Sequence, residues 1–424
     1  MEKKEIEDED FKKLENPVYN LDEEKEILDN NLKEAYYNII DLLKEYLDLN
    51  ERYYNIVALW VIGTYFHTHF PSFPFLFFNA MKGSGKSRAM NLITTLSKDG
   101  EMLNAPTEAV LFRTKGTLGI DEYEGITRKG NEGIRELLNS CYKKGVKVKR
   151  MRQQKGVDGT QQVVEEFEVY RPVVLANIWG MESVLGDRCI SLILDKSNRK
   201  EVINLIEIFN EDEKLIKTKE LLKECSLCSY FPERYREVYK EWNKSIKRNN
   251  TNYTNNTNYT NSTNYTKLFK SLNLMDLNGR ELELSFPLCL IANMINNQNI
   301  GKNDEISVVS VVSSVVSDAI LEETTLTLKE IFNEKKEEEI VENYDINLID
   351  FTSSKLQTNY FESLKNILIE FKESLAITED WINLKWLGRA LKRLNLIKTK
   401  RRTSRGVEII LDVEKAQTKI KMFK

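Results

Sequence analysis

A short glycine-rich segment directly after an apolar run constrains this chain more than any other feature. The run covers residues 73–78, and the next residues are Asn79-Ala80-Met81-Lys82-Gly83-Ser84-Gly85-Lys86-Ser87. A strand that feeds such a turn and then an amphipathic helix is typical of a phosphate-binding loop, whose backbone N–H groups surround the anion. Ala80 stands where the usual pattern has its first glycine. We predict that ATP phosphates are bound by Gly83, Ser84, Gly85, Lys86 and Ser87, with Lys86 contacting the β- and γ-phosphates and Ser87 holding Mg²⁺.

Two carboxylates follow a second apolar segment. Residues 117–120 are strand-like and end in Asp121-Glu122, 35 residues after Lys86. A nucleotide hydrolase needs acidic groups opposite its phosphate loop, so we predict that Asp121 anchors Mg²⁺ through water and that Glu122 polarises the attacking water. The alternative is that both are ordinary surface charges.

Two further polar residues lie at the ends of predicted strands. The strand 172–176 is followed by Asn177, which we predict to orient the attacking water or to sense the γ-phosphate; the alternative is a cap of the next turn. Arg188 directly precedes the strand 189–194. We predict that it acts as an arginine finger on the nucleotide of a neighbouring subunit, and the alternative is a surface pair with Asp187.

The alternation of apolar strand-like runs with helical stretches predicts an α/β fold with a parallel sheet and flanking helices. We divide the 424 residues into an acidic, disordered lead-in, a phosphate-loop ATPase core with its preceding helices, a helical lid region, a variable linker and a winged-helix domain. Their predicted ranges are 1–30, 31–198, 199–300, 301–345 and 346–424. An Asn/Thr-rich tract at 249–266 cannot bury apolar surface, so we predict a mobile loop there.

Charge is distributed unevenly and indicates nucleic acid as a partner. The net charge is −4, but residues 1–30 carry −7 and residues 385–424 carry +10. Residues 143–155 contain seven basic side chains and no acidic one, and their alternation predicts a hairpin. We predict that its residues Lys147, Lys149, Arg150 and Arg152 contact the DNA backbone, the alternative being a solvated hairpin.

The C-terminal segment has the element order of a winged helix. Short helices precede a basic amphipathic helix near 384–394, and residues 397–411 predict two strands joined by a basic turn. We predict DNA contacts by Lys385, Arg389, Lys392, Arg393, Arg401, Arg402 and Arg405, although many winged helices bind only protein.

Composition favours a soluble protein of the cytoplasm. The chain has 41% hydrophobic residues but no apolar run of about 18 residues, and it begins Met-Glu-Lys-Lys, unlike a signal peptide. Five irregularly spaced cysteines do not indicate a disulfide framework. We therefore expect no membrane partner.

Several blocks resemble the AAA+ type ATPases of phages, plasmids and archaeal mobile elements, which are related to primase-associated helicases. The resemblance covers most of residues 57–300 and is carried, besides the phosphate loop, by residues 58–65, 107–113, 137–145, 186–190 and 279–288. It implies that ATP hydrolysis is carried by Lys86, Ser87, Asp121, Glu122, Asn177 and Arg188, and it agrees with a C-terminal winged helix. Ala80 and the Asn/Thr-rich tract depart from the family pattern.

The sequence thus predicts a DNA-dependent ATPase that forms homo-oligomers and acts as a helicase-like motor in the replication of a mobile element. The alternative is a DNA-binding initiator, loader or regulator that uses ATP only as an assembly switch. Both share every motif named above, and either could work with a primase or polymerase.

Overall fold

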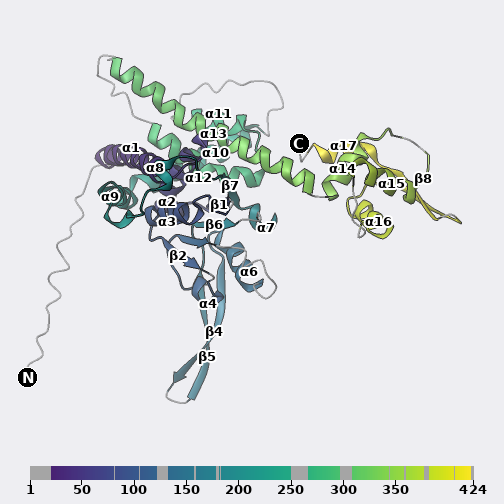
Figure 1. Cartoon of the computed structure of the whole chain (residues 1–424), viewed down its shortest axis with the longest axis horizontal. Helices are drawn as coiled ribbons and strands as arrows, with labels where there is room; N and C mark the ends of the chain where they lie inside the picture. The colour runs from purple at the N-terminus through teal and green to yellow at the C-terminus, as the bar shows by residue number, and fades with distance from the viewer. Residues whose placement is uncertain are drawn as a thin grey trace, which may run out of the picture. The chain divides into compact units, whose positions relative to one another are not determined.

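The chain divides into two compact units, Met1–Lys329 and Glu330–Lys424 (Figure 1). The structure is a computed structural model that describes residues 21–421 with gaps at 81, 105, 122–131, 157–158, 178–180, 182, 250–265, 297–307, 343, 358–359, 377–381 and 405. The predicted loop 249–266 falls almost wholly outside the described residues, as do residues 1–20 of the predicted lead-in.

A five-stranded parallel sheet forms the centre of the first unit. Its strands are β1 (Phe75–Ala80), β2 (Glu101–Asn104), β3 (Leu118–Asp121), β6 (Val173–Asn177) and β7 (Cys189–Leu194), in the order β2-β3-β6-β1-β7. The predicted α/β class with a parallel sheet is confirmed, and four strands correspond to the predicted apolar runs. Strand β2 was not anticipated, because its four residues are exposed or half-buried and form no apolar run.

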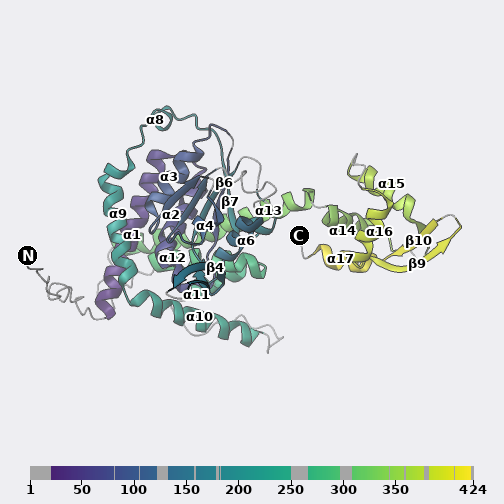
Figure 2. The same ribbon diagram turned by 90° about the horizontal axis from the view of Figure 1, so that it is seen from below.

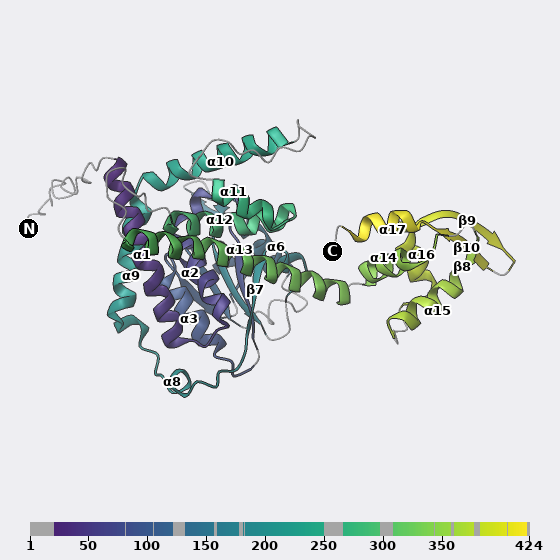
Figure 3. The same ribbon diagram turned by 90° about the horizontal axis from the view of Figure 1, so that it is seen from above.

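Helices cover both faces of this sheet. The helices of this unit that precede α13 are α1 (Leu21–Tyr46), α2 (Glu51–Phe66), α3 (Lys86–Leu96), α4 (Glu108–Leu111), α6 (Glu132–Cys141), α7 (Ser183–Gly186), α8 (Lys200–Ile203), α9 (Glu213–Leu227), α10 (Tyr230–Asn249), α11 (Thr266–Leu274) and α12 (Gly279–Asn296). Figures 2 and 3 place α1, α2, α3 and α9 on one side of the sheet and α6 on the other. Helix α2 is buried on all sides from Tyr53 to Phe66, which explains its continuous apolar sequence.

Helix α1 corrects the prediction for residues 1–30. It begins at Leu21, so residues 21–30 are helical rather than part of a disordered lead-in. The acidic composition concealed an apolar face, on which Leu28, Leu32 and Ile39 are fully buried. Residues 47–50 separate α1 from α2, and Asn50 caps α2 by accepting from the N–H of Arg52.

Helix α13 (Val308–Glu342) occupies most of the predicted variable linker at 301–345. The chain forms 35 helical residues here, although β-branched side chains such as Val and Thr lower helix propensity. Burial overrides that propensity in the middle of the helix, where Ile320, Thr324 and Leu328 recur at four-residue spacing and are buried. The amide of Asn55 on α2 donates to Thr324 Oγ1 at 2.9 Å.

A two-stranded ribbon, β4 (Lys147–Gly156) and β5 (Gly159–Glu168), extends from the first unit, as predicted for the basic segment (Figure 1). Its strands are antiparallel, with Val148 opposite Phe167. The rings of Phe167 and Phe112, the residue after α4, lie 4.6 Å apart between centroids. The base of the ribbon is therefore fixed by aromatic packing against α4.

The second unit begins within α13 and continues with α14 (Tyr344–Ser354), β8 (Glu362–Ser363), α15 (Leu364–Ser374), α16 (Leu384–Arg393), β9 (Ile397–Thr403), β10 (Gly406–Leu411) and α17 (Val413–Ile420). Its antiparallel sheet has the order β8-β10-β9. A core that includes Ile367, Phe371, Leu387 and Leu391 joins the helices to the sheet. The predicted basic helix and hairpin are present as α16 and β9–β10.

No helix in the described ranges is both long and apolar enough to cross a bilayer.

We expect Asn55→Ala to destabilise the first unit, because it removes the polar bridge between α1, α2 and α13. Asn55 accepts from Tyr36 OH at 3.1 Å and donates to Thr324, and all three side chains are buried. Leaving these partners unsatisfied should cost about 1–3 kcal/mol, measured as a lower urea midpoint. The control is Asn31→Ala, whose amide makes an exposed bond to Glu224. Equal midpoints would contradict the packing of α13 on α2.

Candidate functional site at the carboxyl edge of the sheet

The glycine-rich loop connects β1 to α3 and leaves several polar groups available to a ligand. Gly83 and Gly85 have φ angles of 81° and 82°, in the left-handed region that glycine adopts without strain. Gly85 is the N-cap of α3, and no side chain caps that helix end. Ser84 Oγ is buried and has no hydrogen-bond partner among the described residues. This combination suits an anion, which accepts hydrogen bonds and is favoured by the positive end of a helix.

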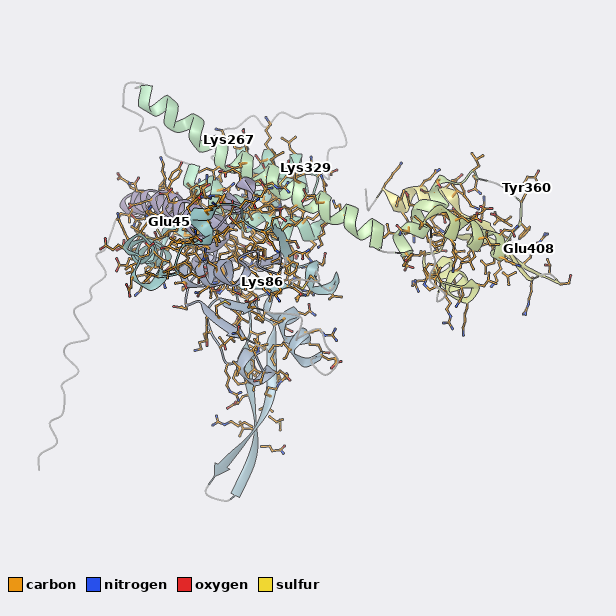
Figure 4. All side chains as sticks on the ribbon, viewed as in Figure 1. Glu45, Lys86, Lys267, Lys329, Tyr360 and Glu408 are labelled. Carbon is orange, nitrogen blue, oxygen red and sulfur yellow. The ribbon has the colours of Figure 1, made fainter. Side chains whose placement is uncertain are left out.

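Three of the predicted site residues meet at this loop. Lys86 Nζ lies 3.0 Å from Asp121 Oδ1, and Ser87 Oγ donates to Asp121 Oδ2 at 2.8 Å. Strands β1 and β3 are not neighbours, because β6 lies between them. The first turn of α3 therefore reaches past the end of β6 to the carboxylate on β3. Figure 4 labels Lys86 in the first unit.

Ser87 and Asp121 fit a magnesium ion. Mg²⁺ prefers oxygen ligands and is usually held by one or two protein groups together with substrate phosphates and waters. The hydroxyl and the carboxylate are already adjacent, and Asp121 is 8% exposed. Across the described part of the chain, no cluster of three or more His, Cys, Asp or Glu side chains could hold a metal by itself. A divalent ion here would need the ligand's phosphates to complete its coordination.

A cavity of about 770 Å³ opens beside the loop, a size that suits a nucleotide. It is lined by residues 82–88 of the loop and the start of α3, and by residues 46–48 at the end of α1 and just after it. The other lining residues are Leu194, Lys196, Ser197, Val202, Ile203 and Glu207. Burial, and then the hydrogen bond that its hydroxyl donates to Asp212, raise the pKa of Tyr46 to about 12. This lining tyrosine therefore stays protonated and uncharged at neutral pH.

Sequence reasoning missed the groups that complete this cavity. Lys196 lies against the loop, since its Cε is 3.7 Å from the position that a Cβ on Gly83 would occupy. Ser197 Oγ donates to Asp48 Oδ2 at 2.7 Å, which links residues after β7 to the α1–α2 connection. Neither contact follows a motif, because each joins segments more than 100 residues apart. The one local signal was that Lys196 is a basic residue two positions after the end of β7.

Two further predicted catalytic residues are Asn177, which ends one strand of the same sheet, and Glu122, which follows another in the sequence. Asn177 is the last residue of β6, is 3% exposed and lies in register with Asn79 on β1, so it is at the same edge as the loop. Glu122 is outside the described residues, and its role stays a prediction.

Arg188 lies at the opposite edge of the sheet. Its carbonyl accepts from Phe75 N at 3.0 Å at the start of β1, whereas the glycine-rich loop follows the end of that strand. Six strand residues separate the two edges by about 20 Å, so Arg188 does not reach its own chain's loop. The alternative pair with Asp187 is not formed either, because Asp187 binds Arg280 at 3.2 Å. Arg188 instead donates to the carbonyl of Val184, and its guanidinium lies 6.0 Å from the ring of Tyr142.

The basic side chains of β4 are paired with glutamates. Lys147 and Lys149 both bind Glu166, at 3.0 and 2.9 Å. Arg152 binds Glu165 at 2.8 Å, and Arg150 pairs with Glu108 of α4. These bonds lower the pKa of Glu166, through Lys149 first and then Lys147. The described part of the ribbon is thus not one-sidedly basic, because β5 supplies opposite charges, and DNA contact by these four residues stays a prediction.

Helix α16 presents a free basic stripe. Lys385, Arg389 and Lys392 recur at i, i+4 and i+7, are exposed, and form no ion pair with other described residues. The buried residues Leu387 and Leu391 lie on the other side of the helix.

The other basic residues predicted in the second unit differ in their contacts. Arg393 is held by both carboxylate oxygens of Asp345, at 2.8 and 2.7 Å. Arg401 is held by Glu408 and by the ring of Phe361, whereas Arg402 is exposed. Arg405 lies outside the described residues.

Comparison with known proteins did not assign the chain to a family. No known family model matches the chain, and a search of curated proteins found no significant match. The resemblance to AAA+ type ATPases therefore stays a prediction.

We expect Asp121→Asn to remove most of the effect of Mg²⁺ on ATP binding. The amide keeps the size of the carboxylate but loses the charge that would fix the ion, which should lower the Mg²⁺-dependent gain in affinity about 10- to 100-fold. ATP titrations with Mg²⁺ and with EDTA measure this gain. The matched control, Asp41→Asn, changes a surface carboxylate that pairs with Lys214. A variant with the full Mg²⁺-dependent gain would contradict the metal assignment.

Proposed function

We propose that this protein is a Mg²⁺-dependent ATPase that binds DNA and works as a homo-oligomer. The observation that carries the proposal is the meeting of Lys86, Ser87 and Asp121 beside a nucleotide-sized cavity. A lysine, a hydroxyl and a carboxylate in contact at a glycine-rich helix start are the groups that phosphoryl transfer from a nucleotide requires.

Each residue has a defined task in this proposal. Lys86 and the N–H groups of the loop hold the phosphates, Ser84 Oγ adds a hydrogen bond that is otherwise unused, and Ser87 with Asp121 binds Mg²⁺. The bound ion supplies neutralisation of the charge that builds up on the phosphate oxygens. Asn177 orients the attacking water, and Glu122 polarises it. Asp121, which contacts Lys86 in this structure, would be one of the residues that hold the ion.

The position of Arg188 supports an oligomer. An arginine about 20 Å from its own phosphate loop contributes to hydrolysis only if another subunit brings a nucleotide to it. In this proposal the phosphate site lies at one edge of the sheet and the finger at the other. In a closed or partial ring of subunits, each finger faces a neighbour's nucleotide, so that both the phosphate site and the finger take part in hydrolysis.

The second unit supports DNA binding. The elements from α14 to β10 have the order that is expected of a winged helix, and α17 follows them. In this proposal α16 is the helix that enters a groove. The free cations Lys385, Arg389 and Lys392 are suited to DNA phosphates.

A helicase-like motor in the replication of a mobile element remains our leading form of the proposal, and the alternative is an initiator, loader or regulator that uses ATP as a switch. The ion pairs along β4 favour the alternative, because they leave fewer free cations to follow a moving strand. A strand-separation assay distinguishes the two. A motor opens a duplex at a cost of about 1.4 kcal/mol per base-pair step, whereas a switch hydrolyses ATP without opening it.

We expect DNA to stimulate ATP hydrolysis. We expect the substitutions Lys86→Ala and Arg188→Ala each to abolish this hydrolysis. Removal of a finger should lower kcat about a thousandfold or more. A mixture of the two variants should regain part of the activity, because a Lys86→Ala subunit still offers Arg188 to a neighbour with an intact loop. The control Arg113→Ala removes an exposed arginine that follows α4, donates to the carbonyl of Ala109 in that helix and lies over the rings of Phe112 and Phe167. Unaltered turnover in Arg188→Ala would exclude the finger, and no turnover in the wild type would exclude an ATPase.

We expect Arg389→Ala and Lys392→Ala each to reduce the salt dependence of duplex DNA binding. The slope of log K against log salt concentration should become shallower by about 0.9 for every DNA phosphate that the variant no longer neutralises. Lys415→Ala on α17 is the control, since Lys415 pairs with Asp412 within the unit. Unchanged slopes for both α16 variants would show that α16 does not touch the DNA backbone.

A further inference from the structure

Arg88, the residue after the Ser87 hydroxyl, joins the start of α3 to a distant segment of the chain. Its guanidinium donates to the carbonyl of Val202, to the carbonyl of Leu205 at 2.8 Å and, from Nε, to Glu207 Oε1 at 2.9 Å. All three donor nitrogens are thus engaged within one stretch of six residues. The side chain is 17% exposed, so these bonds are partly shielded from water.

The segment that Arg88 holds, residues 202–207, is a wall of the cavity. Val202, Ile203 and Glu207 line it together with Arg88. Ile203 is 54% exposed, although it is apolar and borders the cavity. A flat heterocyclic base that covered this side chain would remove apolar surface from water, while its triphosphate reached the loop.

Among the described residues, few other contacts hold residues 203–207 in place. Helix α8 contains four residues, and both Figure 2 and Figure 3 show it within the extended connection between β7 and α9. Val202 and Phe209 are buried, but Ile206 and Ile208 between them are mostly exposed. With so little apolar burial, the three hydrogen bonds from Arg88 decide where residues 203–207 lie.

We propose that Arg88 is a positioning residue that holds residues 202–207 against the glycine-rich loop as the nucleoside-binding wall of the site. This inference rests on the proposed ATP binding and adds the part of the site that recognises the base and ribose. Because its donors are engaged by the wall, Arg88 acts on the nucleoside and not on the phosphates. The direct link between Ser87 and the wall places both ends of the ligand on one helix turn.

The test compares a ligand that has a nucleoside with one that lacks it. Binding of Mg²⁺-ATP and of Mg²⁺-tripolyphosphate is measured by calorimetry for the wild type, Arg88→Ala, Arg88→Lys and the surface control Lys214→Ala. The wild type should prefer ATP. Arg88→Ala should lose about tenfold or more in ATP affinity, since the wall is no longer preorganised, with tripolyphosphate affinity unchanged. Arg88→Lys should behave like Arg88→Ala, because one ammonium cannot replace a planar group that bonds three acceptors.

Other results would overturn the inference in recognisable ways. Equal loss for both ligands in Arg88→Ala, with recovery in Arg88→Lys, would make Arg88 a phosphate-binding charge. ATP affinity unchanged in both variants would show that the wall needs no tether. A wild type that binds neither ligand would overturn the proposed function itself, whereas a wild type that binds both equally would overturn only the nucleoside wall.

Discussion

The contact of Asp121 with Lys86 and Ser87 is the interaction on which the arrangement of the first unit depends. A buried carboxylate is costly unless charged and hydrogen-bonding groups compensate it. Here the compensation comes from the first two residues of α3, across an intervening strand. The carboxylate is therefore satisfied only when the glycine-rich loop, the start of α3 and strands β3 and β6 have taken their places. The same arrangement forms the anion site.

The parallel direction of the strands determines at which edge of the sheet each predicted site residue lies. All five strands run the same way, so the residues that follow them gather at one edge and those that precede them gather at the other. Lys86, Asp121 and Asn177 belong to the first set and Arg188 to the second. Under the proposed function one subunit therefore carries half of each of two sites, and hydrolysis depends on assembly.

The sequence predicted those parts of the fold that local pattern determines. Strands β1 and β7 are apolar runs, and the loop between β1 and α3 needs glycine at two positive φ angles, so both were visible. Strand β2 is held by its neighbour β3 at the sheet edge, and α13 by burial against α2, which no local pattern records. The same holds for the site: the motif residues were found, whereas the contacts of Arg88 and the ion pairs of Lys149 and Arg152 with glutamates depend on tertiary pairing.

The ion pairs along the ribbon of β4 and β5 also affect whether two molecules associate through their exposed strand edges. A ribbon of two ten-residue strands has unpaired backbone groups on both outer edges, and such edges can pair with another molecule. Met151 and Val164, opposite each other and 61% and 52% exposed, add an apolar spot that would favour such pairing. The lysines, arginines and glutamates around this spot would have to be stripped of water if two ribbons joined. The charged pairs of the ribbon thus oppose pairing between the ribbons of two molecules.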